Sequence, residues 1–408
     1  MTLCREGSWN VERRSSCDLE SIALLVCAVQ QRLPAMMSLR ERLSAAIAEE
    51  NKQRAPEHPE NHFVTPIPKE ELSEIRKKVK LFKKLHPGQI ERLERKIQTA
   101  FENSRPAPED INLKQRIADE LQKLAAQVFP RCYVVIYGST ATKLATKRSD
   151  LNLCLFLLNE EGELDWTGGP LRRFHEAILS SKPSFIEKCE YMGGPHVVRL
   201  VCTRENRYLK VCITCNLDHS LAANHLIYHY AQFDDRVAVL DFVVKSWAAK
   251  AGIRHVVDGR LNCYAITLMV IHFLQSACSP SILPNLNALC PGTFLPPSIS
   301  WARSHDGCID DNIKKQMREN HSSVAELFLG FLAYYSKFPW DIDVISVRNG
   351  KRHKNFSLNT AMGIEDPYTN ASATAKFPME HVGKIVQAFK DADSSIFELE
   401  TVDIESLF

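Results

Sequence analysis

The chain has 408 residues, which is long enough for two domains that each bury a sizeable core. Hydrophobic residues make up 45% and charged residues 25%, as in ordinary soluble globular proteins, and the formal net charge is only +2. A global basic field is therefore excluded, so any RNA or DNA site requires a local patch. The 13 cysteines are scattered through apolar and polar runs alike, which favours reduced thiols over a disulfide framework and indicates the cytosol or the nucleus.

Residues 1–65 are expected to form a loosely ordered N-terminal extension. The stretch 51–68 carries four prolines among polar residues, a composition typical of linkers. The apolar run Ile22–Val29 is too short to cross a bilayer, and the acidic residues Asp18 and Glu20 before it are atypical of a signal peptide. We interpret this run as a short helix and expect no membrane partner.

Residues 66–109 are predicted to form amphipathic, basic helices that pack on the core, with a break at Pro87-Gly88. The first helix has four apolar residues at helical spacing and four lysines largely off that stripe: Leu72, Ile75, Val79 and Phe82, and Lys77, Lys78, Lys80 and Lys84. Two interpretations of the lysines are open. A solvated helix face is favoured, and a patch for a phosphate backbone is the alternative.

Residues 110–218 alternate between helical and strand patterns. A helix is expected at about 110–128, and Pro130 prevents it from continuing further. Four runs rich in β-branched, aromatic or other apolar residues then predict strands at 132–137, 151–158, 196–203 and 208–214. The run 151–158 is nearly all apolar, which predicts a strand with both faces buried.

From residue 219 the pattern becomes helical. Helix-length apolar stripes cover His219–Tyr230, Arg236–Ala251, Cys263–Ala277 and Ser323–Lys337. We therefore predict an α+β fold, in which a mixed-sheet domain over 110–218 is followed by a mainly helical domain over 219–390 and a C-terminal tail over 391–408.

Candidate site residues begin where the first strand ends. Gly138 allows the backbone to approach a ligand closely, and the Ser139 hydroxyl and nearby amides can hold a phosphate. Asp150 follows on the next strand, and position 152 shares its face because side chains alternate. Two carboxylates so spaced can bind the two Mg²⁺ ions of a phosphoryl transfer. Position 152, however, holds asparagine.

This region resembles the nucleotidyltransferase superfamily of DNA polymerase beta, in the branch of cytoplasmic poly(A) polymerases and terminal uridylyltransferases. That branch has a GS turn, an S-D-x-D-L strand and a third aspartate in a strand written roughly V-D-I-S-F-N. This chain has GS at 138–139, SDLNL at 149–153 and VCITCN at 211–216, which places Cys212 at the third aspartate. The resemblance continues to about residue 385 through LAANHLI (221–227), VVKSWAAKAGI (243–253), GRLNCYAITLMVIHFLQ (259–275), ELFLGFLAYYSKFPW (326–340) and IEDPY (364–368).

The resemblance implies a nucleotidyltransferase domain followed by a poly(A) polymerase-associated domain, and a role for each matching residue. It implies phosphate contacts for Gly138 and Ser139, metal binding and catalysis for Asp150, a ribose contact for Asn224, a triphosphate contact for Lys245, base stacking for Tyr264 and a nucleotide-binding role for Asp366. From the residues alone, a core aromatic for Tyr264 and an ordinary surface lysine for Lys245 stay open.

Two of the three metal-binding aspartates of this family are replaced here, by Asn152 and Cys212. An amide is a weak Mg²⁺ ligand, and a thiol prefers softer metals. Asp218 is expected to lie too far beyond the strand to substitute. Cys212 and Cys215 form a C-x-x-C pair, but positions i and i+3 of a strand face opposite sides, so we favour buried thiols over a zinc site.

Two functions are open. One is an active enzyme that adds adenylate or uridylate to RNA 3′ ends with Mg²⁺ or Mn²⁺. The other, which Asn152 and Cys212 favour, is a degenerate relative that needs no metal and works in RNA 3′-tailing in the cytoplasm. The implied partners are an RNA 3′ end, a ribonucleoside triphosphate and an RNA-binding protein. No histidine follows IEDPY within 369–376, where uridine-selective members carry one and where Ser372 lies nearest, so nothing favours uridine.

Overall fold

The structure is a computed structural model. It describes residues 64–65, 67–160, 164–165, 168–193, 196–254, 261–290, 294, 311–354, 362–369, 371–374, 379–398 and 404–408. The chain divides into two compact units, and the smaller one, Met1–Glu60 with Pro297–Gly307, lies outside the described residues. The expected N-terminal extension, including its predicted short helix, therefore also lies outside them, apart from residues 64–65.

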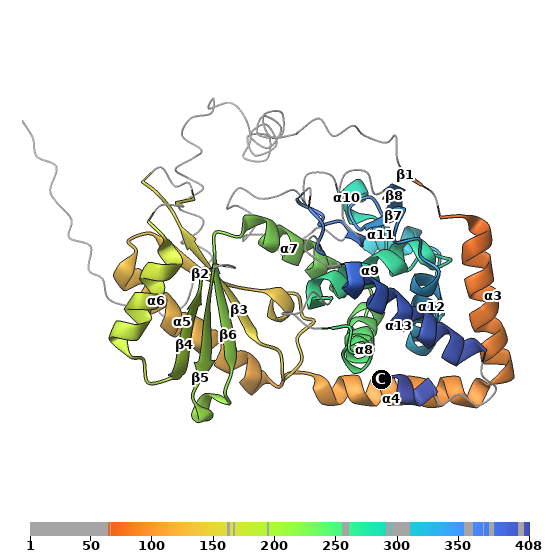
Figure 1. Cartoon of the computed structure of the whole chain (residues 1–408), viewed down its shortest axis with the longest axis horizontal. Helices are drawn as coiled ribbons and strands as arrows, with labels where there is room; N and C mark the ends of the chain where they lie inside the picture. The colour runs from red at the N-terminus through yellow and green to blue at the C-terminus, as the bar shows by residue number, and fades with distance from the viewer. Residues whose placement is uncertain are drawn as a thin grey trace, which may run out of the picture. The chain divides into compact units, whose positions relative to one another are not determined.

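A five-stranded mixed sheet is built from strands between residues 132 and 215 (Figure 1). Its order is β2 (Cys132–Tyr137), β3 (Leu151–Leu157), β6 (Lys210–Cys215), β5 (Val197–Cys202) and β4 (Ile186–Met192). Strands β3 and β6 are parallel and the other pairs are antiparallel. The four predicted strands are confirmed to within two residues at each end. The prediction missed β4, whose sequence IEKCEYM is too polar to indicate a strand.

The two faces of this sheet have different roles. Alternate residues of β3, among them Leu151, Leu153 and Leu155, belong to one hydrophobic cluster with helices α5 (Pro108–Val128) and α6 (Pro170–Ser181). Because side chains alternate along a strand, Asn152 and Cys154 lie on the opposite face. Two helices therefore cover one face of the sheet, and Asn152 lies on the other face.

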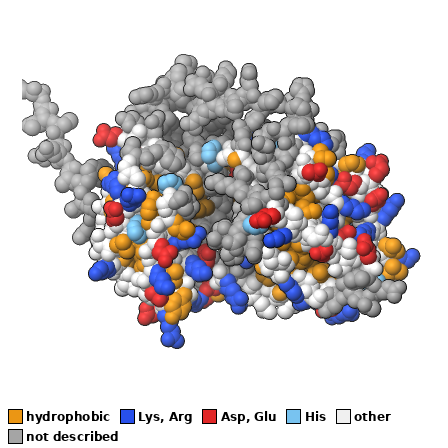
Figure 2. All heavy atoms as spheres, in the orientation of Figure 1, with side chains coloured by type: hydrophobic (Ala, Val, Ile, Leu, Met, Phe, Trp, Pro, Cys, Tyr) orange, Lys and Arg blue, Asp and Glu red, His pale blue; other side chains and the backbone are white. Residues whose placement is uncertain are grey.

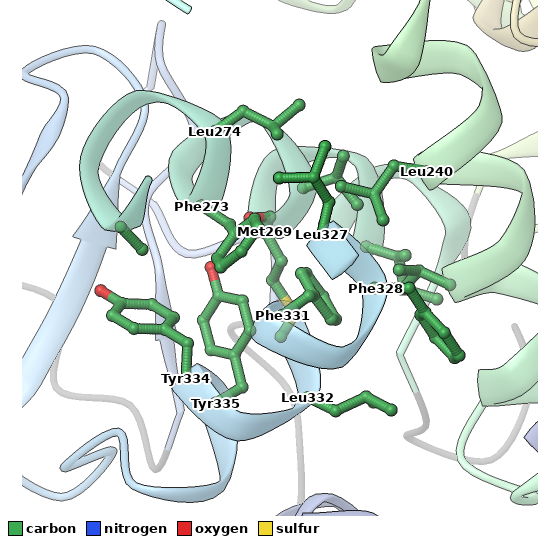
Figure 3. Packing of buried hydrophobic residues seen from close by; sticks show 14 of the residues in the cluster. Leu240, Met269, Phe273, Leu274, Leu327, Phe328, Phe331, Leu332, Tyr334 and Tyr335 are labelled. Carbon is green, nitrogen blue, oxygen red and sulfur yellow. The ribbon is translucent and has the colours of Figure 1, made fainter. Parts of the chain in front are cut away.

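A second hydrophobic cluster holds the helical part together. Its main helices are α3 (Lys69–Leu85), α4 (Pro87–Ser104), α7 (Asp218–Phe233), α8 (Arg236–Lys250), α9 (Cys263–His272), α12 (Val324–Ser336) and α13 (Met379–Phe397). Figure 3 shows side chains of α12, including Phe331 and Tyr335, packed against Met269 and Phe273. The Tyr335 hydroxyl donates a hydrogen bond of 2.8 Å to the Met269 carbonyl, which satisfies this buried phenol. The mainly helical composition predicted from residue 219 is confirmed.

The helix ends follow local chemistry. Pro87 occupies the first turn of α4, where its missing N–H costs nothing, so the predicted break falls between α3 and α4. Ser323 and Glu326 form a capping box at α12, in which each backbone amide donates to the other residue's side chain at 3.1–3.3 Å. A short π-helical segment, Phe273–Ala277, continues α9.

A second, four-stranded sheet was not predicted. Its order is β1 (Val64–Thr65), β8 (Lys351–Lys354), β7 (Asp343–Ser346) and β9 (Gly363–Ile364), and each strand is too short for a periodic signal. Gly363 fits this sheet because a Cβ atom there would collide with the Val344 side chain. Helix α13 also spans the boundary expected between residues 390 and 391, and Ile396 and Ile404 are buried in the helical core. The last residues therefore pack as part of the core rather than as a separate tail.

The lysines of α3 largely face solvent. Lys77, Lys80 and Lys84 are exposed, whereas Lys78 forms a 2.8 Å ion pair with Asp393 of α13. On the face shown in Figure 2, basic and acidic side chains are interspersed, in keeping with a net charge of +2. Over the described residues, no helix is both long enough and apolar enough to cross a membrane.

Candidate active site

The sheet register lines up one residue from each strand on the open face. Tyr137 pairs with Asn152, Asn152 with Cys212, Cys212 with Arg199, and Arg199 with Glu190. Asn152 and Cys212 are therefore direct neighbours on parallel strands. Asp150 lies just before β3, two residues from Asn152, close enough that its charge raises the pKa of the Cys212 thiol. The structure thus brings together the three positions that the sequence pattern singled out.

The glycine-serine turn closes onto Asn152. Gly138 has a φ of +74°, which favours glycine, and a Cβ atom at Gly138 would lie 2.7 Å from Nδ2 of Asn152. The Gly138 amide donates a 3.1 Å hydrogen bond to Oδ1 of Asn224, whose Nδ2 donates to the Ser220 carbonyl at 2.7 Å. Asn224 therefore fixes this turn to helix α7. The Ser139 hydroxyl has no hydrogen-bond partner within the described chain, so it remains available to a ligand.

Substituting Gly138 by alanine should weaken both stability and ligand binding. A positive φ costs alanine about 1–2 kcal/mol, and the collision with Asn152 adds about 1 kcal/mol or more. Gly252→Ala is the matched control, because Gly252 has a φ of +70° and no atom near its Cβ position. Urea unfolding should show a larger loss for Gly138→Ala. Equal losses would mean that the contact with Asn152 does not constrain the turn.

Asp150 is the single carboxylate among the three positions, and cations surround it. Although the residue is exposed, partial desolvation of the Asp150 carboxyl raises its pKa. The charges of Lys210, Lys114 and Arg199, in decreasing order, oppose that rise. Lys114 is only 4% exposed, and its ammonium donates to the Thr140 hydroxyl at 3.2 Å. Burial lowers the pKa of Lys114, and the charges of Asp110 and Asp150 partly offset this effect.

The surroundings of Cys212 favour its thiol over the thiolate. Burial raises its pKa most and the charge of Asp150 raises it further, whereas the nearby cations Arg199 and Lys210 oppose the shift. Cys215 packs against the hydrophobic cluster on the helix-covered face of the sheet, so the two cysteines of the C-x-x-C pair point to opposite sides. The two thiols therefore do not converge on a common ligand position.

The donor set does not fit a pair of Mg²⁺ ions. Mg²⁺ requires hard oxygen ligands, and several carboxylates must offset the repulsion between two metals. The site offers one carboxylate, one amide and one protonated thiol, with Lys114, Lys210 and Arg199 adding positive charge. Within the described ranges, no three residues among His, Cys, Asp and Glu are arranged to hold a metal. Asp218 begins α7, beyond the end of β6 at Cys215, as expected.

The remaining predicted nucleotide contacts already have partners. The Lys245 ammonium donates to Oδ2 of Asp241 at 2.6 Å, and Asp241 is 1% exposed and accepts a second bond from Thr267 at 2.7 Å. The Tyr264 hydroxyl donates to Oδ2 of Asp366 at 2.9 Å. Two backbone amides donate to the other oxygen of Asp366, which holds the IEDPY segment against α9.

Two family models match this chain. One, described as the central palm domain of mitochondrial-like poly(A) RNA polymerase, covers residues 93–232, and the other, described as Cid1 family poly A polymerase, covers residues 323–371. The curated relative "Poly(A) RNA polymerase GLD2" of Bos taurus is 29% identical over 271 residues, which cover 65% of this chain and 55% of that protein. The gld-2 polymerase of Caenorhabditis elegans is 29% identical over 261 residues, covering 61% of this chain and 23% of that protein. The chain thus spans about half the length of the vertebrate relatives.

Solved structures agree with these matches. The structure titled "structure of GLD-2/RNP-8 complex" superimposes with a TM-score of 0.66 and 25% identity, covering 78% of this chain and 98% of that one. A Cid1 poly(U) polymerase crystal structure gives a TM-score of 0.63 at 20% identity, covering 78% and 97%. In both sequence and fold, the chain thus matches the poly(A) polymerase and terminal uridylyltransferase family.

The sequence patterns did not lead us to predict the cations around Asp150. Lys114 carried a usable signal, because it lies at helical spacing from Ile117 and Leu121 on a buried stripe where lysine is unusual. Lys210 shares the alternation of Cys212 along β6, so it was also predictable as a neighbour. Arg199 was not, because its position beside Cys212 depends on the pairing of β5 with β6.

Proposed function

We propose that this chain is a catalytically weak or inactive member of its family that acts in RNA 3′-tailing and post-transcriptional regulation. The observation that carries the proposal is the pairing of Asn152 with Cys212, the positions that the family resemblance assigns to metal-binding aspartates. A site left with Asp150 alone lacks the charge to hold two divalent cations. Each 1.4 kcal/mol of lost transition-state stabilisation costs a factor of about ten in rate, so losing two carboxylates costs several orders of magnitude.

The site keeps features that support ligand binding without catalysis. The Gly138 turn is anchored by Asn224, and the Ser139 hydroxyl is available. We propose that Gly138, Ser139, Asn224, Lys245, Tyr264 and Asp366 contact a ribonucleoside triphosphate, with Asp150 as the remnant of the metal site. Lys245 and Tyr264 also have structural partners in Asp241 and Asp366, so a ligand would share these side chains with the fold.

We propose further that the chain acts in the cytoplasm with an RNA 3′ end and an RNA-binding protein. Support comes from the similarity to the GLD-2/RNP-8 complex, in which GLD-2 is assembled with a second component, RNP-8. A structure of the Cid1 poly(U) polymerase is described as bound to Mg and 3′-dATP, so that protein binds a metal together with a nucleotide.

An active adenylyl- or uridylyltransferase that uses Mg²⁺ or Mn²⁺ is the second candidate. Asp150 and the intact Gly138–Asn224 contact favour it. An extension assay separates the two functions. The purified chain, in excess over an oligoadenylate primer, is incubated with each ribonucleotide and either metal. We expect no extension above the level of Asp150→Ala. Extension by the natural chain that disappears in Asp150→Ala would establish the active enzyme instead.

A further inference from the structure

A pocket opens beside Asp150, between the first half of α5, the loop before β3 and the loop between β5 and β6. Five of its lining residues are cations, namely Lys114, Lys147, Arg148, Arg207 and Lys210. Its carboxylates are Asp110 and Asp150. A pocket with this composition, next to a degenerate metal site, attracts anions rather than divalent cations.

The positive charge of the pocket is not cancelled by the fold. Arg207 forms an ion pair with Asp110, so these two charges offset one another. Lys147, Arg148 and Lys210 are exposed, and none forms an ion pair with another described residue. The buried ammonium of Lys114 lies beneath them. The three exposed side chains can therefore reach a ligand without giving up an internal contact.

Tyr208 adds an aromatic surface to this pocket. It is 53% exposed, although large hydrophobic side chains are usually covered. Both Arg207 and Tyr208 have positive φ values, 56° and 51°, which are rare for such residues and are held by hydrogen bonds to Arg204 and Thr203. An exposed ring among cations is the combination that binds single-stranded nucleic acid, because bases stack on the ring and phosphates contact the charges.

We propose that this pocket binds the phosphate backbone of single-stranded RNA without a divalent metal, with Lys147, Arg148 and Lys210 contacting phosphates and Tyr208 stacking on a base. The proposal rests on the proposed function for the choice of RNA. It deepens that function because it names how the site can hold its ligand once the metals are lost. The protein's own cations then supply positive charge that metals bring in a two-metal site.

The test is the fluorescence anisotropy of a labelled oligoadenylate titrated with the full chain, in EDTA and in Mg²⁺. At equal ionic strength, we expect binding in EDTA to be at least as tight as in Mg²⁺, because Mg²⁺ competes with the protein for phosphates. The double variant Arg148→Ala with Lys210→Ala should weaken binding about tenfold or more and should reduce the salt slope by about two. Tyr208→Ala should weaken binding by about tenfold. The matched control is Lys80→Ala with Lys84→Ala on α3, which removes two exposed lysines outside the pocket. This variant should have the same salt slope as the natural chain.

Three results would overturn the proposal. One is binding that requires Mg²⁺, and another is a larger loss in the α3 control than in the pocket variant. The third is tight binding of inorganic triphosphate at the pocket without binding of the oligoadenylate, which would assign the charges to a free nucleotide. Far-ultraviolet circular dichroism of each variant establishes that it is folded. The extension assay on the same samples reports separately on catalysis. The RNA-binding proposal can therefore fail while the proposed lack of catalysis holds, and the proposed lack of catalysis can fail while RNA binding holds.

Discussion

Replacing Asn152 and Cys212 together by aspartate should raise Mg²⁺-dependent extension of an oligoadenylate primer at least about a hundredfold over the natural chain. The two positions are adjacent in the register of β3 and β6 and lie beside Asp150, so the change would place three carboxylates on one face of the sheet. The Gly138 turn and its anchor Asn224 are already in place. The measurement is single-turnover extension on a denaturing gel.

Arg199 sets a limit on this gain. It is the cross-strand neighbour of position 212, and its charge opposes the rise in the pKa of the thiol there. It would therefore also attract a new carboxylate and compete with a metal. Adding Arg199→Ser to the double change should therefore raise extension further. Each single aspartate change serves as a control and should give a much smaller gain. An inactive triple variant that folds and binds nucleotide would show that the site has lost more than its carboxylates.

The largest loss of stability is expected from Arg352→Met. Arg352 is 2% exposed, and its guanidinium donates to the Tyr334 hydroxyl at 3.0 Å and to the Glu71 carboxylate, and lies 3.9 Å from Asp343. It joins β8 to β7, α3 and α12. Removing Arg352 leaves the Glu71 carboxylate and the Tyr334 hydroxyl without this partner, whereas Asp343 keeps its 2.9 Å ion pair with Lys354. Breaking a buried ion pair costs about 3–5 kcal/mol, and we expect the lower end of that range here.

Lys351→Ala is the matched control for this substitution. Lys351 is exposed and precedes Arg352 on the same strand, so its side chain faces the other way. Its loss should change the free energy of unfolding by less than about 0.5 kcal/mol. Chemical denaturation of both variants gives the comparison. If Arg352→Met lost no more than Lys351→Ala, the contacts of Arg352 would not be holding the small sheet against the helices.

The sequence indicated those elements whose burial leaves a strong periodic pattern. The apolar run of β3 and the stripes of α8 and α12 were found with ends close to the observed ones. Strand β4 was missed because its exposed side chains are charged, and the small sheet because its strands have two to four residues. For such elements, tertiary packing rather than local sequence decides the structure.

The candidate site shows the same division. Asp150, Asn152 and Cys212 followed from spacing and from the family pattern. The register places Asn152 beside Cys212, and Asp150 lies just before the strand that carries Asn152. The cations around them come from α5, β5 and the start of β6, and no local pattern indicates that these elements meet. Their presence changes the interpretation of the site from a weakened metal centre to one whose local charge opposes metal binding.

Direct titration with Mn²⁺, followed by electron paramagnetic resonance, tests the central claim that this site no longer holds metals. The natural chain and Asp150→Ala should leave the same amount of free Mn²⁺ at every point, because one carboxylate among three cations gives no site. The variant with aspartate at positions 152 and 212 should deplete free Mn²⁺ and so provide the positive control. Stoichiometric binding of Mn²⁺ by the natural chain that Asp150→Ala abolishes would contradict this account.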